Sequence, residues 1–313
     1  MNTKLQQMRT KLTFLFALVF LVTFGQSSIV SEEILIHNNT IELPGTLSYV
    51  NQNSALIIWV HGSGNIDRNG NQGSLIKANY IKQFRDSINK KGIAFFSFDK
   101  RTANPNNIKL LKNTLFDDLV RDTQKVIAHF KADNRFSEII LIGHSQGSLI
   151  AMLASEKIDS YISLAGPAES IDKTLIQQIS KQAPLLGDIA KAHIKELKET
   201  GAIKDVNPML LSLFNKSNQP FLANWMLYNP SEEIKKLTIP ILIINGTKDI
   251  QVKEEDANIL HKANEKSTLA IIKNMNHVLK NIAVDADNMK SYYSADYALS
   301  KQLITTIVAF INN

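Results

Sequence analysis

The stretch that decides the fold runs from Glu138 to Ile150 and reads EIILIGHSQGSLI. Its four apolar residues at 139–142 predict a short buried strand. Gly143-His144-Ser145-Gln146-Gly147 follows at once, and a small, apolar, helix-compatible run begins at Ser148. Strand, tight turn and helix form the context that the G-x-S-x-G pattern of a nucleophilic serine requires. The two glycines let the helix pass close to the strand, so we expect the Ser145 hydroxyl at the carboxyl end of a sheet.

Buried strands alternate with helices on both sides of this stretch. Predicted buried strands cover 55–60, 93–98, 138–142, 161–164, 240–245 and 269–272, and 55–60 and 139–142 are continuous apolar runs. Helical periodicity covers 74–91, 114–130, 254–261 and 295–311, and two short strands at 34–36 and 46–49 flank a turn predicted at Pro44-Gly45. This alternation predicts an α/β fold with a mostly parallel central sheet, helices on both faces, and ligands bound beyond the carboxyl ends of the strands.

The alternation stops between residues 168 and 236. This segment contains helical stretches, apolar clusters and four prolines, which predict a helical cap insertion over the active end of the sheet. The α/β domain then comprises 27–167 and 237–313. Three aromatic residues of the cap are candidates to line a pocket for the acyl or alcohol group, with the cap's own core as the alternative place for each of them: Phe221, Trp225 and Tyr228.

Residues 1–26 differ from the rest of the chain. Lys4, Arg9 and Lys11 precede an apolar run from Leu12 to Phe24, and small or polar residues follow. This order is typical of a cleaved secretory signal peptide, and the run is too short to span a bilayer comfortably. We therefore expect a secreted or periplasmic protein without stable membrane insertion after cleavage. An uncleaved amino-terminal membrane anchor is the alternative.

Composition narrows the classes of partner. The 313 residues contain no cysteine, which excludes disulfides and thiolate metal sites. Three positive charges of the net +6 lie in the first 26 residues, and the mild surplus that remains gives no indication of nucleic-acid binding. The sequence shows neither a set of metal ligands nor a glycine motif for phosphate or dinucleotide, so we expect no metal and no cofactor. Nothing in it indicates the oligomeric state.

Three polar residues follow predicted buried strands in the order Ser145, Asp249, His277. A serine hydroxyl needs a base to take its proton, and the base needs an anion to hold its tautomer and stabilise its charged form. Because the carboxyl ends of parallel strands meet at one edge of a sheet, we expect these three side chains to converge there as nucleophile, acid and base. Other carboxylates compete less well for the acid role, since one lies in a predicted helix and two lie past the histidine: Asp256, Asp285 and Asp287.

A polar, glycine-rich loop, HGSGNIDRNGN at 61–71, follows the apolar run at 55–60. Such a loop suits an oxyanion hole, in which backbone N–H groups point at the negative charge that develops during acyl transfer. One donor is expected from Gln146, the residue after the nucleophile, and the other from Ser63 or its neighbour Gly64. His61 and His144 flank these turns and are expected to shape them rather than to act as the base.

The chain resembles the α/β-hydrolase superfamily, and within it the bacterial carboxylesterases close to the serine-aminopeptidase-like hydrolases. The likeness rests on the loop at 61–71 and on KGIAFFSFDKR (91–101), LIGHSQGSLIA (141–151), INGTKDIQV (244–252) and MNHVLK (275–280). It implies hydrolysis of a small-molecule carboxylic ester with a short- to medium-chain acyl group through a Ser145 acyl-enzyme. Two departures affect the expected pocket mouth: Asn65 stands where related esterases usually have proline, and Thr102 where they have glycine.

Two other functions stay open. A serine peptidase of the aminopeptidase or prolyl type would use the same triad and would need a group that binds the substrate's terminus, for which Glu169, Glu196 and Glu199 are candidates. A catalytically silent binding protein is the second alternative. An ester substrate and an aminoacyl-arylamide, assayed side by side, separate these possibilities.

Overall fold

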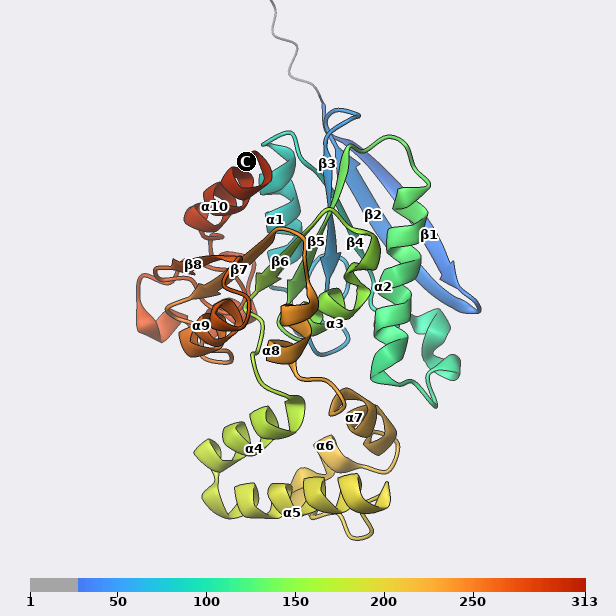
Figure 1. Cartoon of the computed structure of the whole chain (residues 1–313), viewed down its shortest axis with the longest axis vertical. Coiled ribbons are helices and arrows are strands. Elements are labelled where there is room, and N and C mark those ends of the chain that lie inside the picture. Colours follow the sequence, from blue (N-terminus) through green and yellow to red (C-terminus); the bar gives the residue numbers. More distant parts are fainter. Residues whose placement is uncertain (1–27) are drawn as a thin grey trace, which may run out of the picture.

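The fold is built on one eight-stranded sheet. The computed structural model describes residues 28–313, so the predicted signal peptide at 1–26 lies outside the described residues. The strand order is β1-β2-β4-β3-β5-β6-β7-β8, in which β3 to β8 run parallel and β1 and β2 pair antiparallel at one edge (Figure 1). The strands are β1 Val30–Asn38, β2 Ile41–Tyr49, β3 Ala55–Val60, β4 Ala94–Phe98, β5 Glu138–His144, β6 Ser160–Leu164, β7 Ile241–Gly246 and β8 Thr268–Ile272.

Side chains of the central strands alternate between two apolar cores, one on each face of the sheet. In β3, Leu56 and Ile58 belong to one core while Ile57 and Trp59 belong to the other, because successive side chains of a strand point to opposite faces. Both faces are covered, so the strand has no polar positions. This is why the buried strands read as continuous apolar runs, and it confirms the predicted α/β class.

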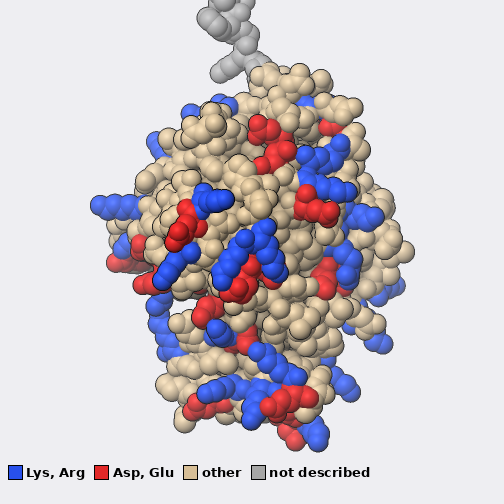
Figure 2. All heavy atoms as spheres, viewed as in Figure 1, with Lys and Arg blue, Asp and Glu red and all other residues tan. Residues whose placement is uncertain are grey.

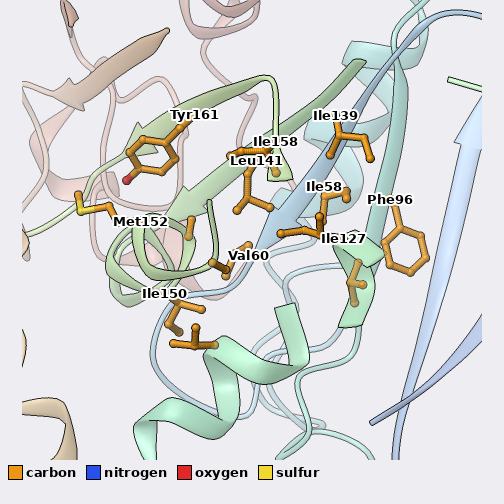
Figure 3. Close-up of a cluster of buried hydrophobic side chains, with 14 of the residues drawn as sticks. Ile58, Val60, Phe96, Ile127, Ile139, Leu141, Ile150, Met152, Ile158 and Tyr161 are labelled. Carbon is orange, nitrogen blue, oxygen red and sulfur yellow. The ribbon is translucent and has the colours of Figure 1, made fainter. Parts of the chain in front are cut away.

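Helices cover both faces. Against the core that holds Leu56 pack α2 Phe116–Lys131, α3 Gln146–Ala154 and α9 Glu254–Ala263, and against the other pack α1 Tyr80–Asn89 and α10 Lys301–Ile311. Figure 3 shows the first core, where Ile58 and Leu141 of neighbouring strands face Ile127 of α2 and Ile150 of α3. Short 3₁₀ helices lie in the connections: η1 Pro105–Leu110, η2 Ser155–Lys157, η5 Asp285–Asp287 and η6 Lys290–Tyr292.

The insertion between β6 and β7 is helical. It consists of α4 Ile171–Gln182, α5 Pro184–Thr200, η3 Pro208–Leu210, α6 Leu211–Phe214, α7 Gln219–Trp225, α8 Pro230–Glu233 and η4 Ile234–Lys236. Helices α4 to α7 form a layer beyond the carboxyl ends of the strands, with a small core of their own that includes Ile194, Phe214 and Leu222 (Figure 1). Further along, α8 packs on α3 and α9, and Ile234 of η4 is buried in the core of the sheet. Within residues 28–313, no helix is long and apolar enough to cross a membrane.

Three local predictions were wrong. Pro44-Gly45 is not a turn but lies inside β2, and the chain reverses at Asn39-Thr40 instead. Gly45 is needed there because a Cβ at this position would lie 2.4 Å from the ring of Phe96 on the neighbouring strand. The helix predicted at 74–91 begins only at Tyr80, and the helix predicted from 295 begins at Lys301, where the Ser300 side chain accepts a hydrogen bond from the N–H of Leu303.

Candidate active site

Ser145 sits on a strained turn between β5 and α3. Its backbone has φ 55° and ψ −123°, in a region that non-glycine residues rarely adopt, and its N–H donates to the Leu164 carbonyl at 3.0 Å. The glycines on either side permit this geometry. A Cβ at Gly143 would lie 2.3 Å from the Gly147 carbonyl oxygen, and one at Gly147 would lie 2.2 Å from the Val60 carbonyl oxygen. The turn therefore brings α3 against the ends of β3 and β5 with no room for side chains.

The loops after β7 and β8 bring Asp249 and His277 together. The Nδ1 of His277 lies 2.8 Å from Oδ2 of Asp249, whose side chain is fully buried. The other carboxylate oxygen, Oδ1, accepts the backbone N–H groups of Gln251 and Val252 at 2.8 and 2.9 Å. An ionised carboxylate only accepts hydrogen bonds, so Nδ1 of His277 carries the proton in this pair. Nε2 of the neutral ring is then the atom that is free to act as a base.

A single cavity of about 1250 Å³ contains both Ser145 and His277 in its lining. The part of the chain that the structure describes shows no direct hydrogen bond between these two side chains; in resting active sites such bonds are often long and shorten only when substrate binds. His144 contacts the backbone of His277. Its Nε2 donates to the His277 carbonyl oxygen at 2.8 Å, and burial keeps its pKa well below the usual value, so the ring is neutral. This contact agrees with the expectation that His144 shapes the site.

The loop after β3 lies against Ser145. A Cβ at Gly62 would come within 3.1 Å of the Cβ of Ser145, and Ser63 and Gly64 line the cavity beside it. Arg68 holds this loop in place because its guanidinium pairs with Asp99 at 2.8 Å. On the other side of the cavity, Gln146 is the first residue of α3, where a backbone N–H has no acceptor within its own helix.

Lys100 is a part of the site that sequence reasoning missed. It follows β4 by two residues, it is only 6% exposed, and it lines the cavity. Its ammonium donates to the Gly62 carbonyl oxygen and to Oε1 of Gln146, both at 2.8 Å. Burial lowers the pKa of Lys100 to about 7. The available signal was a lysine directly past the carboxyl end of a fully apolar strand, in the Asp99-Lys100-Arg101 segment.

The three aromatic candidates of the insertion lie in different surroundings. Phe221 and Trp225 line the cavity, and the ring of Trp225 stacks on Phe116 of α2 with centroids 5.1 Å apart. Tyr228 is not among the lining residues, because its hydroxyl turns toward α2 and donates to Asp117 at 2.7 Å. Two of the predicted aromatic residues therefore face the space above Ser145, and the third joins the insertion to the body of the fold.

The remaining lining of the cavity is mixed. Apolar side chains line it together with neutral amide and hydroxyl side chains from the loop after β3 and from the insertion: Gln72, Thr174, Gln178, Ser212, Asn215, Ser217 and Asn218. Apart from histidine, the ionisable lining side chains are Lys100, Tyr80, Tyr292 and Tyr293, and none of the described lining residues is Asp or Glu. No group of three His, Cys, Asp or Glu side chains in residues 28–313 is placed to hold a metal ion.

Comparison with known proteins identifies the family. The BD-FAE family model matches residues 47–263, which is more than half of the chain. Esterase EstD of Thermotoga maritima is 22% identical over 242 residues, covering 71% of this chain and 54% of EstD. The chain thus spans about half the length of this curated relative.

Solved structures with the same architecture are more distant in sequence. Est1E from Butyrivibrio proteoclasticus matches with a TM-score of 0.57 at 17% identity, over 90% of this chain and 99% of Est1E. The Pyrococcus furiosus esterase Pf2001 matches with a TM-score of 0.59 at 16% identity, over 91% of both chains. At such identities the likeness concerns the fold alone. The chain belongs to the BD-FAE family, and it has the α/β-hydrolase fold.

Proposed function

We propose that this protein hydrolyses small-molecule carboxylic esters through a covalent Ser145 acyl-enzyme. Oγ of Ser145 attacks the ester carbonyl carbon and gives its proton to Nε2 of His277, while the carbonyl π electrons move onto oxygen. The backbone N–H groups of Ser63, or Gly64, and Gln146 receive that oxyanion. When the tetrahedral intermediate collapses, the alcohol leaves with the proton from His277. Water, activated by the same histidine, then releases the acid and restores Ser145.

The observation that carries this proposal is that His277, held by the buried Asp249, lines the same cavity as the strained Ser145. One carboxylate oxygen of Asp249 accepts two backbone N–H groups, and the other accepts Nδ1–H of His277. A carboxylate anchored in this way has one orientation, so it holds one tautomer of the base. Position, tautomer and access to solvent-filled space are the three conditions that a serine nucleophile needs from its surroundings.

The cavity supports an ester rather than a substrate with a free amino terminus. An aminopeptidase needs a carboxylate to pair with the substrate's ammonium group. The three glutamates considered for that role lie outside the cavity: Glu169 and Glu199 approach Lys173 and Lys195, and Glu196 accepts the Lys204 N–H. The buried cation Lys100 would also repel an ammonium group. We therefore place esters ahead of peptides and ahead of a silent binding role.

The acyl group is proposed to be short to medium in length, bound beside Phe221 and Trp225. We further propose that the protein acts outside the cytoplasm after removal of residues 1–26, with no cofactor and with small molecules as its partners rather than nucleic acid. Figure 2 supports the last point for the face it shows, where Lys and Arg side chains alternate with Asp and Glu instead of forming one basic patch.

A parallel assay of two substrate classes tests the proposal. Purified protein is given p-nitrophenyl esters of increasing acyl length and an aminoacyl-arylamide, with an ester of ferulic acid in the panel because a solved Est1E structure holds ferulic acid. We expect turnover of the esters, labelling of Ser145 by a fluorophosphonate, and loss of both in Ser145→Ala. Full ester turnover by Ser145→Ala would refute the assignment of the nucleophile. Faster cleavage of the arylamide than of every ester would favour a peptidase, and no labelling of the wild type would favour a silent protein.

A further inference from the structure

Lys100 contacts both halves of the predicted oxyanion hole. Its ammonium donates to the carbonyl oxygen of Gly62 on the loop after β3 and to the side chain of Gln146 at the start of α3. These two segments supply the two backbone N–H donors that the mechanism assigns. A single buried side chain therefore holds together two loops that must keep a fixed separation for an oxyanion to fit between them.

The contact with Gly62 also acts through a covalent path. The Gly62 carbonyl and the Ser63 N–H belong to the same peptide unit. A hydrogen bond from a cation to that carbonyl oxygen draws electron density toward oxygen and makes the N–H on the other side a stronger donor. Lys100 would thus strengthen as well as position the Ser63 donor, although its nitrogen touches neither Ser63 nor Ser145.

The charge of Lys100 has no anionic partner among residues 28–313, unlike the charge of the next residue. Arg101 is equally buried and pairs with Asp122 at 2.6 Å. An ammonium without a counter-ion in a buried site is costly, so its retention needs a reason. Two of its three N–H groups are used by Gly62 and Gln146, and the described residues offer no acceptor for the third, while the side chain lines the cavity.

Lys280 provides an internal comparison. It is also a buried lysine without a carboxylate contact, but its ammonium reaches three acceptors, which are the carbonyl oxygens of Ala78 and Tyr297 and the side chain of Gln83. It is absent from the cavity lining. A buried lysine that only ties loops together can therefore satisfy all its donors in this fold, and Lys100 does not.

We propose that Lys100 is a positioning residue for the oxyanion hole, whose ammonium orders the Gly62–Ser63 peptide and Gln146 and adds a positive charge next to the two donor segments. This inference rests on the proposed ester hydrolysis. The negative charge that pairs with Lys100 is absent in the ground state and forms in the transition state. Lys100 consequently stabilises the transition state more than the bound substrate, which is the condition for raising kcat rather than lowering KM.

The surroundings of Lys100 simplify its titration. The ionisable groups near it are His61, Asp99, Arg101, Asp122 and, in the cavity lining, His144 and His277. The carboxylates are paired with arginines, and burial lowers the pKa of both His61 and His144, so these rings stay neutral. Burial lowers the pKa of Lys100 itself to about 7, so its cation is lost as the pH rises through neutrality. Wild-type kcat should therefore decline on the alkaline side.

Lys100→Met tests the proposal, because it removes the charge and the donors at nearly constant volume. We expect kcat for a p-nitrophenyl ester to fall about 10- to 100-fold, less than for direct loss of an oxyanion donor, with little change in KM. Affinity for an aryl boronic acid, which forms a tetrahedral anion on Ser145, should fall by the same factor, while affinity for the neutral product alcohol should not. Lys100→Arg should recover part of kcat. The alkaline decline should be absent from Lys100→Met.

Three outcomes would overturn the proposal. One is a Lys100→Met protein that keeps kcat per fluorophosphonate-reactive site and loses only thermal stability, which would make the lysine purely structural. The second is an equal loss of affinity for boronate and alcohol. The third outcome is a wild-type pH profile in which kcat does not decline on the alkaline side. If Lys100→Met does not fold, this profile and the kcat of Lys100→Arg decide instead. Ester turnover that survives Ser145→Ala would point to failure of the proposed function itself, which these outcomes leave intact.

Discussion

Replacing Asp249 with asparagine should abolish most of the activity while leaving the fold intact. In the native protein, Oδ1 of Asp249 accepts two backbone N–H groups, from Gln251 and Val252, and Oδ2 accepts Nδ1–H of His277. The amide that replaces this carboxylate must place its NH₂ group on one side or the other. The orientation of the amide decides whether His277 keeps the tautomer that a base requires.

The energies favour the inactive orientation. An NH₂ group at the Oδ1 position would face two backbone N–H donors, and leaving the part-buried N–H of Val252 without its acceptor costs about 1–3 kcal/mol. An NH₂ group at the Oδ2 position keeps both of those bonds and donates to Nδ1 of His277. The ring then carries its proton on Nε2 and cannot accept one from Ser145. For a tautomer error of this kind in a serine triad, kcat falls about 10⁴-fold, which is about 5 kcal/mol of barrier.

The assay is steady-state hydrolysis of p-nitrophenyl acetate at neutral pH, with a urea titration to confirm folding. Asp256→Asn is the matched control, because Asp256 is partly buried and likewise accepts two backbone N–H groups, those of Ala168 and Lys253 at 2.9 and 3.2 Å, yet makes no contact with His277. We expect it to keep kcat within about twofold of wild type. Asp249→Asn retaining more than about a tenth of wild-type kcat, or an equal loss in both variants, would refute the reasoning.

Two further predictions concern stability. Gly147→Ala would place a Cβ 2.2 Å from the Val60 carbonyl oxygen, so α3 must move away from β3 and the free energy of unfolding should fall by about 1–3 kcal/mol; an unchanged urea midpoint would contradict this. Burial lowers the pKa of His61 to about 4, whereas the unfolded chain binds that proton near pH 6.5. Stability carried by neutral His61 is therefore present above pH 6.5 and is lost as the pH falls toward 4, by about 2 kcal/mol at pH 5, and a urea midpoint equal at pH 7 and pH 5 would argue against it.

Much of the architecture could be read along the chain because its cause is local. A strand covered on both faces has few polar positions, so 55–60 and 139–142 stand out as apolar runs. The errors arose where local pattern and neighbouring structure disagree. Leu75 was counted as part of the apolar face of the predicted helix, yet it is 87% exposed. The segment instead forms isolated β-bridges from Gln72 to Ile66 and to Ile76.

The candidate site also contains residues that the sequence alone could place and residues that it could not. Ser145, Asp249 and His277 each follow a strand that is recognisable by itself, and parallel strands bring their carboxyl ends to one edge, so a spatial prediction needs only the strand assignments. Tyr228 and Lys100 lack such a rule. Tyr228 is 111 residues from Asp117, the acceptor that draws it away from the cavity.

The sequence by itself determined the glycine-bounded turn at Ser145, the order of the three polar residues and the α/β class, because each depends on residues adjacent along the chain or on the direction of a buried strand. Only the tertiary structure decided that Lys100 joins the two sides of the predicted oxyanion hole. Its partners Gly62 and Gln146 lie 38 and 46 residues away along the chain. The electrostatic energy of a buried charge depends on the groups that surround it in space, and only the folded chain brings those groups together.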